Sequence, residues 1–329
     1  MTTMLHDNHG RPLTYLRLAV TDRCNLRCFY CMPNEGMTFL PREEILSYEE
    51  MERLIALMVD MGIRKVRITG GEPFVKKDMI DFLARICSID QLDEVHITTN
   101  GVLTEPHIPK LKEIGIKSVN LSLDTISKEK FKKITFRDEF DNVMKSFHSF
   151  IAHGIPLKIN MVVMDQQNSD DILSMVELAR NYPVDVRFIE EMPFNGNSHE
   201  YVAPVWNYKK IMAHIKQQYP EMKALPIPPH STSKSYHIPG FKGKIGVIAA
   251  YSRTFCHDCN RIRITAKGTL KNCLYDNGVL DLKTLLRTGY SDEELKVELL
   301  KIFSQRPKDG FEAAKSRDSS YESMTTIGG

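Results

Sequence analysis

The chain has 329 residues, of which 44 are basic and 42 acidic, so its formal net charge is only +2. This balance excludes a protein that coats nucleic acid and a polybasic membrane binder, because both need a large excess of positive charge. No stretch approaches the roughly 20 apolar residues of a membrane span, and the polar beginning MTTMLHDNHG lacks the apolar core of a secretory signal. We therefore expect a cytoplasmic protein without a nucleic-acid or membrane partner.

Length and changes of composition predict two folding units. A chain of 329 residues exceeds what one hydrophobic core usually organises. The Pro- and Ser-rich run LPIPPHSTSKSYHIPG interrupts the preceding pattern. We expect a first domain at 1–223, a linker at 224–240 and a C-terminal region at 241–329. The polar stretch from Arg306 to Gly329 is expected to form a flexible tail.

Between residues 15 and 190, short apolar runs alternate with longer amphipathic stretches, which indicates βα units around a parallel sheet. The six expected strands are Tyr15 to Val20, Lys65 to Thr69, Glu94 to Thr98, Ser118 to Leu123, Leu157 to Val163 and Asp185 to Ile189. Helices are expected between them, for example at 48–61 and 170–181. Six units are too few for a closed eight-fold barrel of ~250 residues. The α/β sequence predicts an incomplete barrel or an open doubly wound sheet.

A first cysteine group follows the first expected strand. Cys24, Cys28 and Cys31 form the pattern Cx3CxYC, with Tyr30 before the third cysteine. Such spacing in a reducing compartment is typical of metal or cluster ligands rather than disulfides. Three thiolates on a four-iron cluster leave one iron open for another ligand, as in catalytic metal sites. A structural zinc knot is the alternative, although no fourth Cys or His lies nearby.

The turn Gly70-Gly71-Glu72-Pro73 follows the second expected strand and strengthens this interpretation. Its two glycines permit close approach of the backbone, and the Glu72 carboxylate is expected to meet the ammonium group of a bound ligand. A tight turn without a ligand is the alternative. Cys87, in contrast, lies on a helical stretch without cysteine neighbours and is expected to be a core residue.

A second cysteine group lies near the end of the chain, where Cys256, Cys259 and Cys273 again offer three thiolates. The pairing with the first group indicates a second cluster with its own open iron. A zinc site completed by His257 is the alternative, but an imidazole inside a CxxC turn rarely reaches the same metal ion.

Basic residues flanked by apolar ones recur in four expected strands. They are Arg17, Arg67, Lys158 and Arg187. In a barrel covered by helices, alternation sends the apolar neighbours outward and the basic residues into the lumen. Buried cations need an anionic partner, which is either an internal Asp or Glu or a polyanionic substrate. The four together favour a phosphorylated substrate.

Further polar residues lie near these cations in the predicted fold. Thr98, Ser122 and Asn160 are close to the rim ends of their strands, where such side chains can hold a ribose or another ligand. Arg261 and Arg263 share one face of an extended segment after Cys259 and can clamp phosphate. A solvated strand edge is the alternative for the two arginines.

The motifs TDRCNLRCFYCMP, IRITGGEP, TTNG, NLSLD, RFIEEM, CHDCNRIR and a terminal Gly-Gly occur in this order over nearly the whole chain. In this combination the sequence resembles the GTP 3′,8-cyclase family, which are radical S-adenosylmethionine (SAM) enzymes of molybdenum cofactor biosynthesis. Cx3CxYC and GGEP mark only the radical SAM superfamily, whereas CxxCxRxR, the third cysteine and Gly-Gly point to this family. The resemblance implies an incomplete six-fold (βα) TIM-like barrel whose opening is covered by a C-terminal extension.

The resemblance also implies two [4Fe-4S] clusters and SAM as cofactors, and GTP as substrate. The implied cluster ligands are Cys24, Cys28 and Cys31 for the first cluster and Cys256, Cys259 and Cys273 for the second. The implied SAM contacts are Tyr30, Gly71, Ser122 and Met192. The implied GTP contacts are Arg17, Arg67, Thr98, Lys158, Arg261 and Arg263. The implied catalytic residues are Arg17, Arg187, Gly328 and Gly329.

The implied lyase reaction converts GTP to 3′,8-cyclo-7,8-dihydro-GTP and cleaves SAM to 5′-deoxyadenosine and methionine. A 5′-deoxyadenosyl radical removes the ribose 3′ hydrogen, and the C3′ radical attacks C8 of guanine. The implied partners are an external electron donor and a downstream cyclic pyranopterin monophosphate synthase, and a homodimer is left open. A radical SAM maturase acting on a peptide is the alternative of the same fold. An electron carrier or zinc-stabilised binding protein is the alternative of another class.

Overall fold

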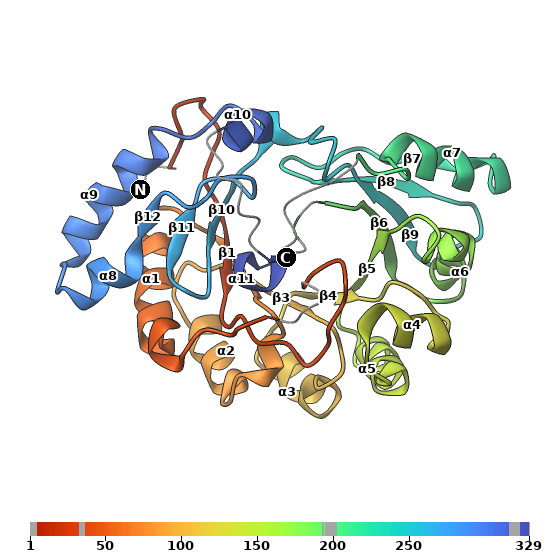
Figure 1. Cartoon of the computed structure of the whole chain (residues 1–329), viewed down its shortest axis with the longest axis horizontal. Helices are drawn as coiled ribbons and strands as arrows, with labels where there is room; N and C mark the ends of the chain where they lie inside the picture. The colour runs from red at the N-terminus through yellow and green to blue at the C-terminus, as the bar shows by residue number, and fades with distance from the viewer. Residues whose placement is uncertain (1–4, 33–36, 193, 195–202, 316–322, 329) are drawn as a thin grey trace.

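A computed structural model of the chain describes residues 5–32, 37–192, 194, 203–315 and 323–328. Within these residues, one curved sheet of twelve strands carries the fold. Figure 1 shows helices around the outer side of the sheet and a short C-terminal helix on its inner side. We call the inner side of the sheet the lumen.

The first half of the chain supplies six parallel strands that neighbour one another in chain order. They are β1 (Tyr15–Ala19), β2 (Lys65–Thr69), β3 (Glu94–Thr99), β4 (Ser118–Ser122), β5 (Leu157–Val163) and β6 (Asp185–Glu190). All six expected strands are confirmed, and each end lies within one residue of its expected position. A doubly wound sheet would reverse its strand order at a switch point. Because this order has no reversal, the sheet is an incomplete barrel.

The C-terminal half adds strands to both edges of this parallel sheet. At the β6 edge lie β9 (Lys244–Ile248), β8 (Ser233–His237) and β7 (Lys223–Ala224), and at the β1 edge lie β10 (Arg261–Ile264), β11 (Thr269–Lys271) and β12 (Leu280–Asp281). Both β9 and β10 run parallel to their neighbours. Strand β8 lies inside the segment 224–240, which sequence composition marks as a linker, so the domain boundaries themselves stay a prediction.

Helices cover the outer face of the sheet (Figure 1). The described α-helices are α1 (Tyr48–Asp60), α2 (Met79–Cys87), α3 (Ile108–Glu113), α4 (Lys128–Thr135), α5 (Phe140–Ala152), α6 (Ile172–Asn181) and α7 (Tyr208–Gln218), followed by α8 (Leu282–Arg287), α9 (Asp292–Phe303), α10 (Gly310–Lys315) and α11 (Met324–Ile327). Helix α11 is the exception, since it lies on the inner side of the sheet. None of these described helices combines the length and apolarity that crossing a membrane requires.

Local sequence signals set the ends of the first helix. Ser47 Oγ accepts a hydrogen bond from Glu50 N at 3.2 Å, and Glu50 Oε2 accepts one from Ser47 N at 2.7 Å. This is the expected capping box, which satisfies two amide groups that have no partner within the helix. Gly62 follows the helix with φ of 115°, which favours glycine. The expected helix at 48–61 is thus confirmed.

The main hydrophobic core lies between the strands and the outer helices. Leu16 and Leu18 on β1 and Val66 and Ile68 on β2 are fully buried. Successive side chains of a strand point to opposite faces, so the residues between them face the lumen. Cys87 packs against the edge of this core, in agreement with the expected core position.

The expected flexible tail from Arg306 onward is wrong for the described residues of that stretch. Arg306, Ala313 and Ile327 are 3%, 3% and 1% exposed. Helix α11 is buried on the lumen side, where the hydroxyls of Ser323 and Thr325 form hydrogen bonds with protein groups. Because their hydroxyls have hydrogen-bond partners in the protein, these polar side chains are buried rather than exposed to solvent. Gly329 lies outside the described residues.

Replacement of a core residue on the outer face of β5 tests this arrangement. Ile159 is fully buried, so Ile159→Ala removes buried methyl groups and leaves a cavity. We expect the free energy of unfolding to fall by about 2–5 kcal/mol in chemical denaturation. Val297→Ala on α9, where the side chain is 52% exposed, serves as the control and should change it by less than about 0.5 kcal/mol. Equal effects of the two changes would contradict the assigned faces.

Candidate active site

The first cysteine group lies on the loop that follows β1. Burial raises the pKa of the Cys24 thiol to about 11, with a contribution from the charge of Glu72, and it raises that of Cys31 to about 12, with a contribution from Cys24. Burial also raises the pKa of Cys28. Buried thiols without a metal therefore stay protonated, whereas a bound metal deprotonates them. The residues fit a site that is completed by metal.

Within the described residues, no three His, Cys, Asp or Glu side chains are grouped as ligands of one metal ion. The four-iron cluster expected at the first cysteine group and its zinc alternative both stay predictions.

Backbone contacts fix the first cysteine loop to the glycine turn after β2. Gly71 N donates a hydrogen bond to Thr21 O, and Glu72 N donates one to Arg23 O, both at 2.8 Å. A Cβ atom on Gly71 would lie 2.2 Å from Arg23 O. The two motifs thus touch backbone to backbone, and glycine is required because a side chain has no room.

The Glu72 carboxylate is held by protein groups. Its Oε1 accepts hydrogen bonds from Phe74 N at 3.1 Å and Thr99 Oγ1 at 2.9 Å, and its Oε2 accepts one from Asn100 N at 2.7 Å. Burial raises its pKa to about 7. These hydrogen bonds join the ends of β2 and β3, and the expected contact of Glu72 with an ammonium group stays a prediction.

Two residues beside the first cysteine group were missed in the sequence. Asp124 follows β4, and its Oδ2 accepts a hydrogen bond from Tyr30 Oη at 2.8 Å while its Oδ1 accepts one from Val162 N at 2.9 Å. Asn100 Nδ2 lies 3.6 Å from Cys24 Sγ. Both residues end short motifs, NLSLD and TTN, whose position after a strand is the signal that could have identified them.

The expected cations converge in the lumen. Arg17 is the register partner of Arg263 on one side and Arg67 on the other, so three arginines lie side by side on adjacent parallel strands. Burial lowers the pKa of Lys158 to about 8, and the nearby charges of Arg187 and Arg67 lower it further. Like charges in direct register destabilise a sheet, so this face needs a compensating anion.

Among the described residues, the charge of Asp185 acts on Lys158 and Arg187, but Asp185 forms no ion pair with either of them. Within the part of the chain that the structure describes, no ion pair joins an Asp or Glu to any of five lumen cations, which are Arg67, Lys158, Arg187, Arg261 and Arg263. Arg67 instead donates to Tyr15 Oη at 2.7 Å and to Ile97 O at 2.8 Å. The internal-pairing alternative is therefore not supported for these five residues, and a polyanionic ligand fits them.

Uncharged polar atoms on the same face also lack partners. Thr98 Oγ1, Asn120 Oδ1 and Asn160 Oδ1 are buried and have no hydrogen-bond partner among the described residues. Thr98 is the register partner of Asn120, and Asn160 pairs with Ser122 and Arg187 on its two sides. Buried polar atoms are nearly always hydrogen-bonded, so these atoms indicate a polar ligand.

The second cysteine group lies beside β10. Burial raises the pKa of the Cys259 thiol, but the nearby charges of Arg261 and Arg306 outweigh it and lower that pKa to about 6. Burial raises the pKa of Cys273 to about 11, and the neighbouring thiols of Cys259 and Cys256 raise it further. His257 is exposed, which does not favour its role as a fourth ligand. The charges of Cys256 and Cys259 thus act on Cys273, and their joint role as cluster ligands stays a prediction.

The two cysteine groups lie at opposite ends of the cationic face. Cys259 precedes β10, whose first residue Arg261 is the register partner of Tyr15 at the beginning of β1. The first cysteine group instead follows the carboxyl end of β1. Arg17 therefore lies on the strand that separates the two groups.

Helix α11 connects the two ends of this site (Figure 1). Ser323 Oγ donates a hydrogen bond to Cys31 O at 2.6 Å, and Gly328 O accepts one from Arg263 Nη1 at 2.8 Å. Between them, Ile327 belongs to a small buried cluster against which Met192 and Cys273 pack. The expected catalytic Gly328 thus lies among the lumen cations.

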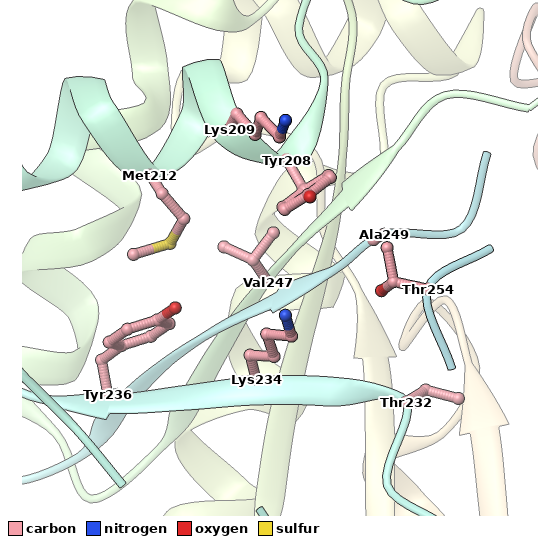
Figure 2. Close-up of a pocket in the computed structure, with 9 residues that line it drawn as sticks. All are labelled: Tyr208, Lys209, Met212, Thr232, Lys234, Tyr236, Val247, Ala249 and Thr254. Carbon is pink, nitrogen blue, oxygen red and sulfur yellow. The ribbon is translucent and has the colours of Figure 1, made fainter. Parts of the chain in front are cut away.

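A separate cavity of about 290 Å³ lies between α7 and the strands β8 and β9 (Figure 2). Its lining includes Tyr208, Lys234 and Tyr236, but none of the expected site residues. We therefore do not include it in the candidate active site.

Comparisons with known proteins show which families this chain matches. A model described as the radical SAM superfamily matches residues 18–179, and one described as Molybdenum Cofactor Synthesis C matches residues 184–312. A GTP 3′,8-cyclase from Clostridium perfringens (strain SM101 / Type A) is 37% identical over 325 residues, which cover 99% of this chain and 100% of the relative. The mitochondrial GTP 3′,8-cyclase of Arabidopsis thaliana is 42% identical over 303 residues, which cover 90% and 76%.

Other relatives are longer than this chain. Molybdenum cofactor biosynthesis protein 1 of Drosophila melanogaster is 42% identical over 304 residues, which cover 92% of this chain. The chain spans about half the length of the animal relatives it matches, 54% in this case. Among solved structures, SuiB of Streptococcus suis bound to S-adenosylmethionine has a TM-score of 0.62 at 16% identity, covering 91% of this chain and 68% of SuiB. At that identity the likeness shows the fold alone.

Removal of one lumen cation tests the electrostatic argument. We expect Lys158→Met to raise the free energy of unfolding of the ligand-free protein at pH 7 by about 1 kcal/mol or more, because it removes a buried charge among like charges. The pKa of folded Lys158, about 8, lies below its ordinary value of 10.5. Above pH 8 the folded chain has lost a proton that the unfolded chain keeps, so the free energy of unfolding of the wild type rises with pH. The difference in this free energy between Lys158→Met and the wild type therefore becomes smaller.

The measurement is chemical denaturation of both proteins between pH 7 and about 10, a window set by the two pKa values above. Lys145→Met, at an exposed position of α5, is the control and should stay within about 0.5 kcal/mol of wild type. A destabilised Lys158→Met at pH 7 would show that the charge is compensated within the protein.

Substitution of one glycine tests the contact between the two motifs. Gly71→Ala places a Cβ atom against Arg23 O, a backbone atom that cannot move aside as a flexible side chain can. We expect a destabilisation of about 1–3 kcal/mol and a loss of iron and SAM binding at the first cysteine group. Iron analysis and equilibrium dialysis with SAM measure both. Unchanged binding of SAM would mean that the glycine turn does not position the loop.

Proposed function

Because this chain belongs to the GTP 3′,8-cyclase family of radical SAM enzymes, we propose that it converts GTP to 3′,8-cyclo-7,8-dihydro-GTP while SAM is cleaved to 5′-deoxyadenosine and methionine. This is the first step of molybdenum cofactor biosynthesis. The observation that carries the proposal is the row of three lumen arginines on adjacent strands, Arg263, Arg17 and Arg67, between two groups of three cysteines. A triphosphate supplies the anion that this face needs.

The first cysteine group holds the cluster that binds SAM in this proposal. Cys24, Cys28 and Cys31 are its ligands, and the open iron leaves room for the amino and carboxylate groups of SAM. Cleavage of SAM there supplies the 5′-deoxyadenosyl radical that removes the ribose 3′ hydrogen. The chain holds SAM in position for this cleavage through the proposed SAM contacts, which are grouped with the first cysteine loop in this proposal. They are Tyr30, Gly71, Ser122 and Met192.

The lumen cations bind and orient GTP. Arg17, Arg67 and Lys158 come from strands of the parallel sheet, and Arg261 and Arg263 come from β10, so phosphate oxygens meet donors from several directions. Guanidinium groups bind phosphate through paired N–H donors, which also fixes orientation. Thr98 Oγ1 is a buried hydroxyl that has no hydrogen-bond partner among the described residues, and it is a further GTP contact.

The second cysteine group binds a second four-iron cluster beside the guanine base. Its proposed ligands are Cys256, Cys259 and Cys273, and its open iron is left for the base. This site lies at the β10 end of the lumen, whereas the first lies beyond the carboxyl end of β1. GTP bound between them would present its ribose to one cluster and its base to the other.

Four further roles concern catalysis. We assign Arg17 and Arg187 to stabilisation of charge near the reacting ribose and base, because both carry lumen guanidiniums close to Arg67. Gly328 and Gly329 are assigned to the part of the chain that approaches the substrate. The hydrogen bond from Arg263 to Gly328 O supports this for Gly328, because Arg263 is itself a proposed GTP contact.

The proposed reaction needs partners outside the chain. Reduction of the first cluster requires an external electron donor, and the cyclised product requires a cyclic pyranopterin monophosphate synthase that consumes it. We expect a cytoplasmic protein, since six thiols used as cluster ligands need a reducing compartment. A homodimer is the assembly that we would test first.

The decisive experiment is anaerobic incubation of the iron-reconstituted protein with GTP, SAM and dithionite. We expect 5′-deoxyadenosine and a cyclised product of the same mass as GTP, both detected by mass spectrometry. Cys24→Ala should abolish both, because SAM is no longer cleaved. Cys273→Ala should abolish the cyclised product. Cys87→Ala, which changes a cysteine outside both groups, is the matched control and should retain activity.

The alternatives give different results. Formation of 5′-deoxyadenosine without conversion of GTP would leave only the radical SAM assignment and make a peptide the next substrate to test. Absence of SAM cleavage in a fully reconstituted protein would favour an electron carrier. Retention of cyclisation in Cys273→Ala would refute the role of the second cysteine group.

A further inference from the structure

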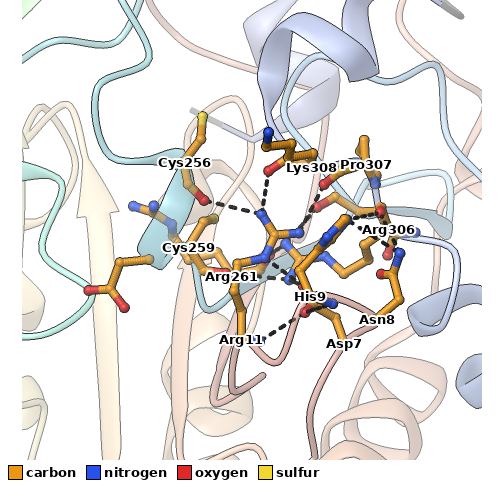
Figure 3. Close-up of polar contacts among 12 residues, drawn as sticks. Asp7, Asn8, His9, Arg11, Cys256, Cys259, Arg261, Arg306, Pro307 and Lys308 are labelled. Carbon is orange, nitrogen blue, oxygen red and sulfur yellow. Dashed lines mark hydrogen bonds and ion pairs between the residues drawn. The ribbon is translucent and has the colours of Figure 1, made fainter.

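A buried cluster of charged side chains joins the beginning of the chain to the second cysteine group (Figure 3). The Asp7 carboxylate is fully buried, and its Oδ2 lies 2.7 Å from Arg11 Nε and 3.0 Å from Arg306 Nη1. Its Oδ1 accepts hydrogen bonds from the backbone N atoms of His9 and Arg11, both at 2.9 Å. The side chains of Arg11 and Arg306 are only 8% and 2% exposed. We call Asp7, Arg11 and Arg306 the clamp.

The clamp holds the backbone of all three segments that carry the second group of cysteines. Arg11 Nη1 donates to Cys256 O at 3.1 Å. Arg306 Nη1 donates to Cys259 O at 3.4 Å, and its Nη2 donates to Asn272 O at 2.9 Å, immediately before Cys273. Because the clamp binds backbone oxygens, it fixes the segments and leaves the sulfur atoms to other ligands.

Further hydrogen bonds join the clamp residues to the C-terminal part of the chain and to the N-terminal turn. Arg11 also donates to Lys308 O at 2.8 Å and to Pro307 O at 2.9 Å. Arg306 O in turn accepts a hydrogen bond from Asn8 Nδ2 at 3.1 Å. Figure 3 shows both guanidiniums between the N-terminal turn and the cysteine segment. The clamp is therefore held on several sides and is a rigid support for the cysteines.

The charge of the clamp has a second effect. Two guanidiniums and one carboxylate leave an excess of one positive charge beside the cysteines, in a buried region where charges are weakly screened. A reduced cluster carries one more negative charge than an oxidised one. Nearby positive charge therefore stabilises the reduced state, and net charge and hydrogen bonding are known determinants of cluster potentials.

We propose that Asp7, Arg11 and Arg306 are positioning residues of the second cysteine group, which fix the geometry of its thiolates and raise the reduction potential of the cluster that they hold. This inference rests on the second four-iron cluster of the proposed function. A purely structural role, in which the clamp only ties the two ends of the chain together, is the competing explanation. The positioning role and the purely structural role predict different effects of substitutions on the reduction potential of the cluster.

The test uses the full-length chain with Cys24, Cys28 and Cys31 changed to Ala, so that iron is bound at the second group alone. After anaerobic reconstitution, its midpoint potential is measured by a redox titration followed by electron paramagnetic resonance. Arg306→Gln removes a positive charge and should lower the potential. Asp7→Asn removes a negative charge and should raise it. Shifts of opposite sign do not follow from a structural role, because both changes break the same ion pair.

Two further variants separate charge from geometry. Arg306→Lys keeps the charge but cannot reproduce the forked hydrogen bonds, so it should restore the potential while retaining less iron per chain. Arg53→Gln is the matched control, because Arg53 also joins a carboxylate and a backbone carbonyl, those of Asp292 and Tyr290, at a distant exposed site. It should change neither iron content nor potential.

Three results would overturn the proposal. They are shifts of the same sign in Arg306→Gln and Asp7→Asn, unchanged potentials with full iron content, and loss of iron together with loss of the circular dichroism spectrum of the folded chain. Loss of iron with an intact spectrum would support the positioning role. A wild-type chain that binds two clusters but does not cyclise GTP refutes the proposed function and leaves this inference standing. A wild-type chain that binds one cluster refutes the second cluster and the inference together.

Discussion

Repulsion between arginines in register is the constraint on which the rest of the molecule depends. Arg263, Arg17 and Arg67 lie on three adjacent parallel strands, where backbone pairing holds their side chains on one face. Hydrogen bonds from Arg67 to Tyr15 Oη and from Arg263 to Gly328 O offset part of this repulsion, and a bound anion would offset more. The opposite face compensates, because it carries the apolar residues of the same strands into a continuous core with the outer helices. The barrel thus combines a stable exterior with an interior that is suited to binding rather than to stability.

The two cysteine groups are held in place by different physical means. The first depends on backbone contacts, since a glycine turn allows two adjacent loops to approach closely without intervening side chains. The second depends on buried side chains that hold carbonyl oxygens. One guanidinium, that of Arg27, binds a cysteine carbonyl in the first group, whereas two, those of Arg11 and Arg306, bind cysteine carbonyls in the second. The two sites can therefore have different electronic properties although each offers three thiols.

Much of the fold and part of the site could be predicted from the sequence because they leave periodic or local signals. Alternation of apolar and basic residues marked both faces of strands such as β1, and cysteine spacing marked both groups. The register of the strands has no such signal, so the side-by-side position of Arg17 and Arg263 could be established only from the structure. Asp124 was missed because its partner Tyr30 is 94 positions away.

Composition gives a wrong prediction where polar residues are buried together with their hydrogen-bond partners. The stretch after Arg306 is polar, yet Ser323 and Thr325 are 7% and 1% exposed because their hydroxyls are hydrogen-bonded. Glu72 is likewise buried, and its carboxylate accepts hydrogen bonds from neighbouring backbone amides. The sequence shows that a side chain is polar but does not show its hydrogen-bond partner. That partner decides whether the residue faces a ligand, solvent or protein.

The ion pair between Asp7 and Arg306 also bears on the order in which the protein folds. These residues are 299 positions apart, so they meet only after nearly the whole chain has been brought together. The first cysteine group has a contact of the same kind, because Ser323 Oγ donates a hydrogen bond to Cys31 O from 292 positions away. Contacts between distant residues form late because closing a long loop costs more entropy. Both cysteine groups are therefore complete only after residues near the two ends of the described chain have met.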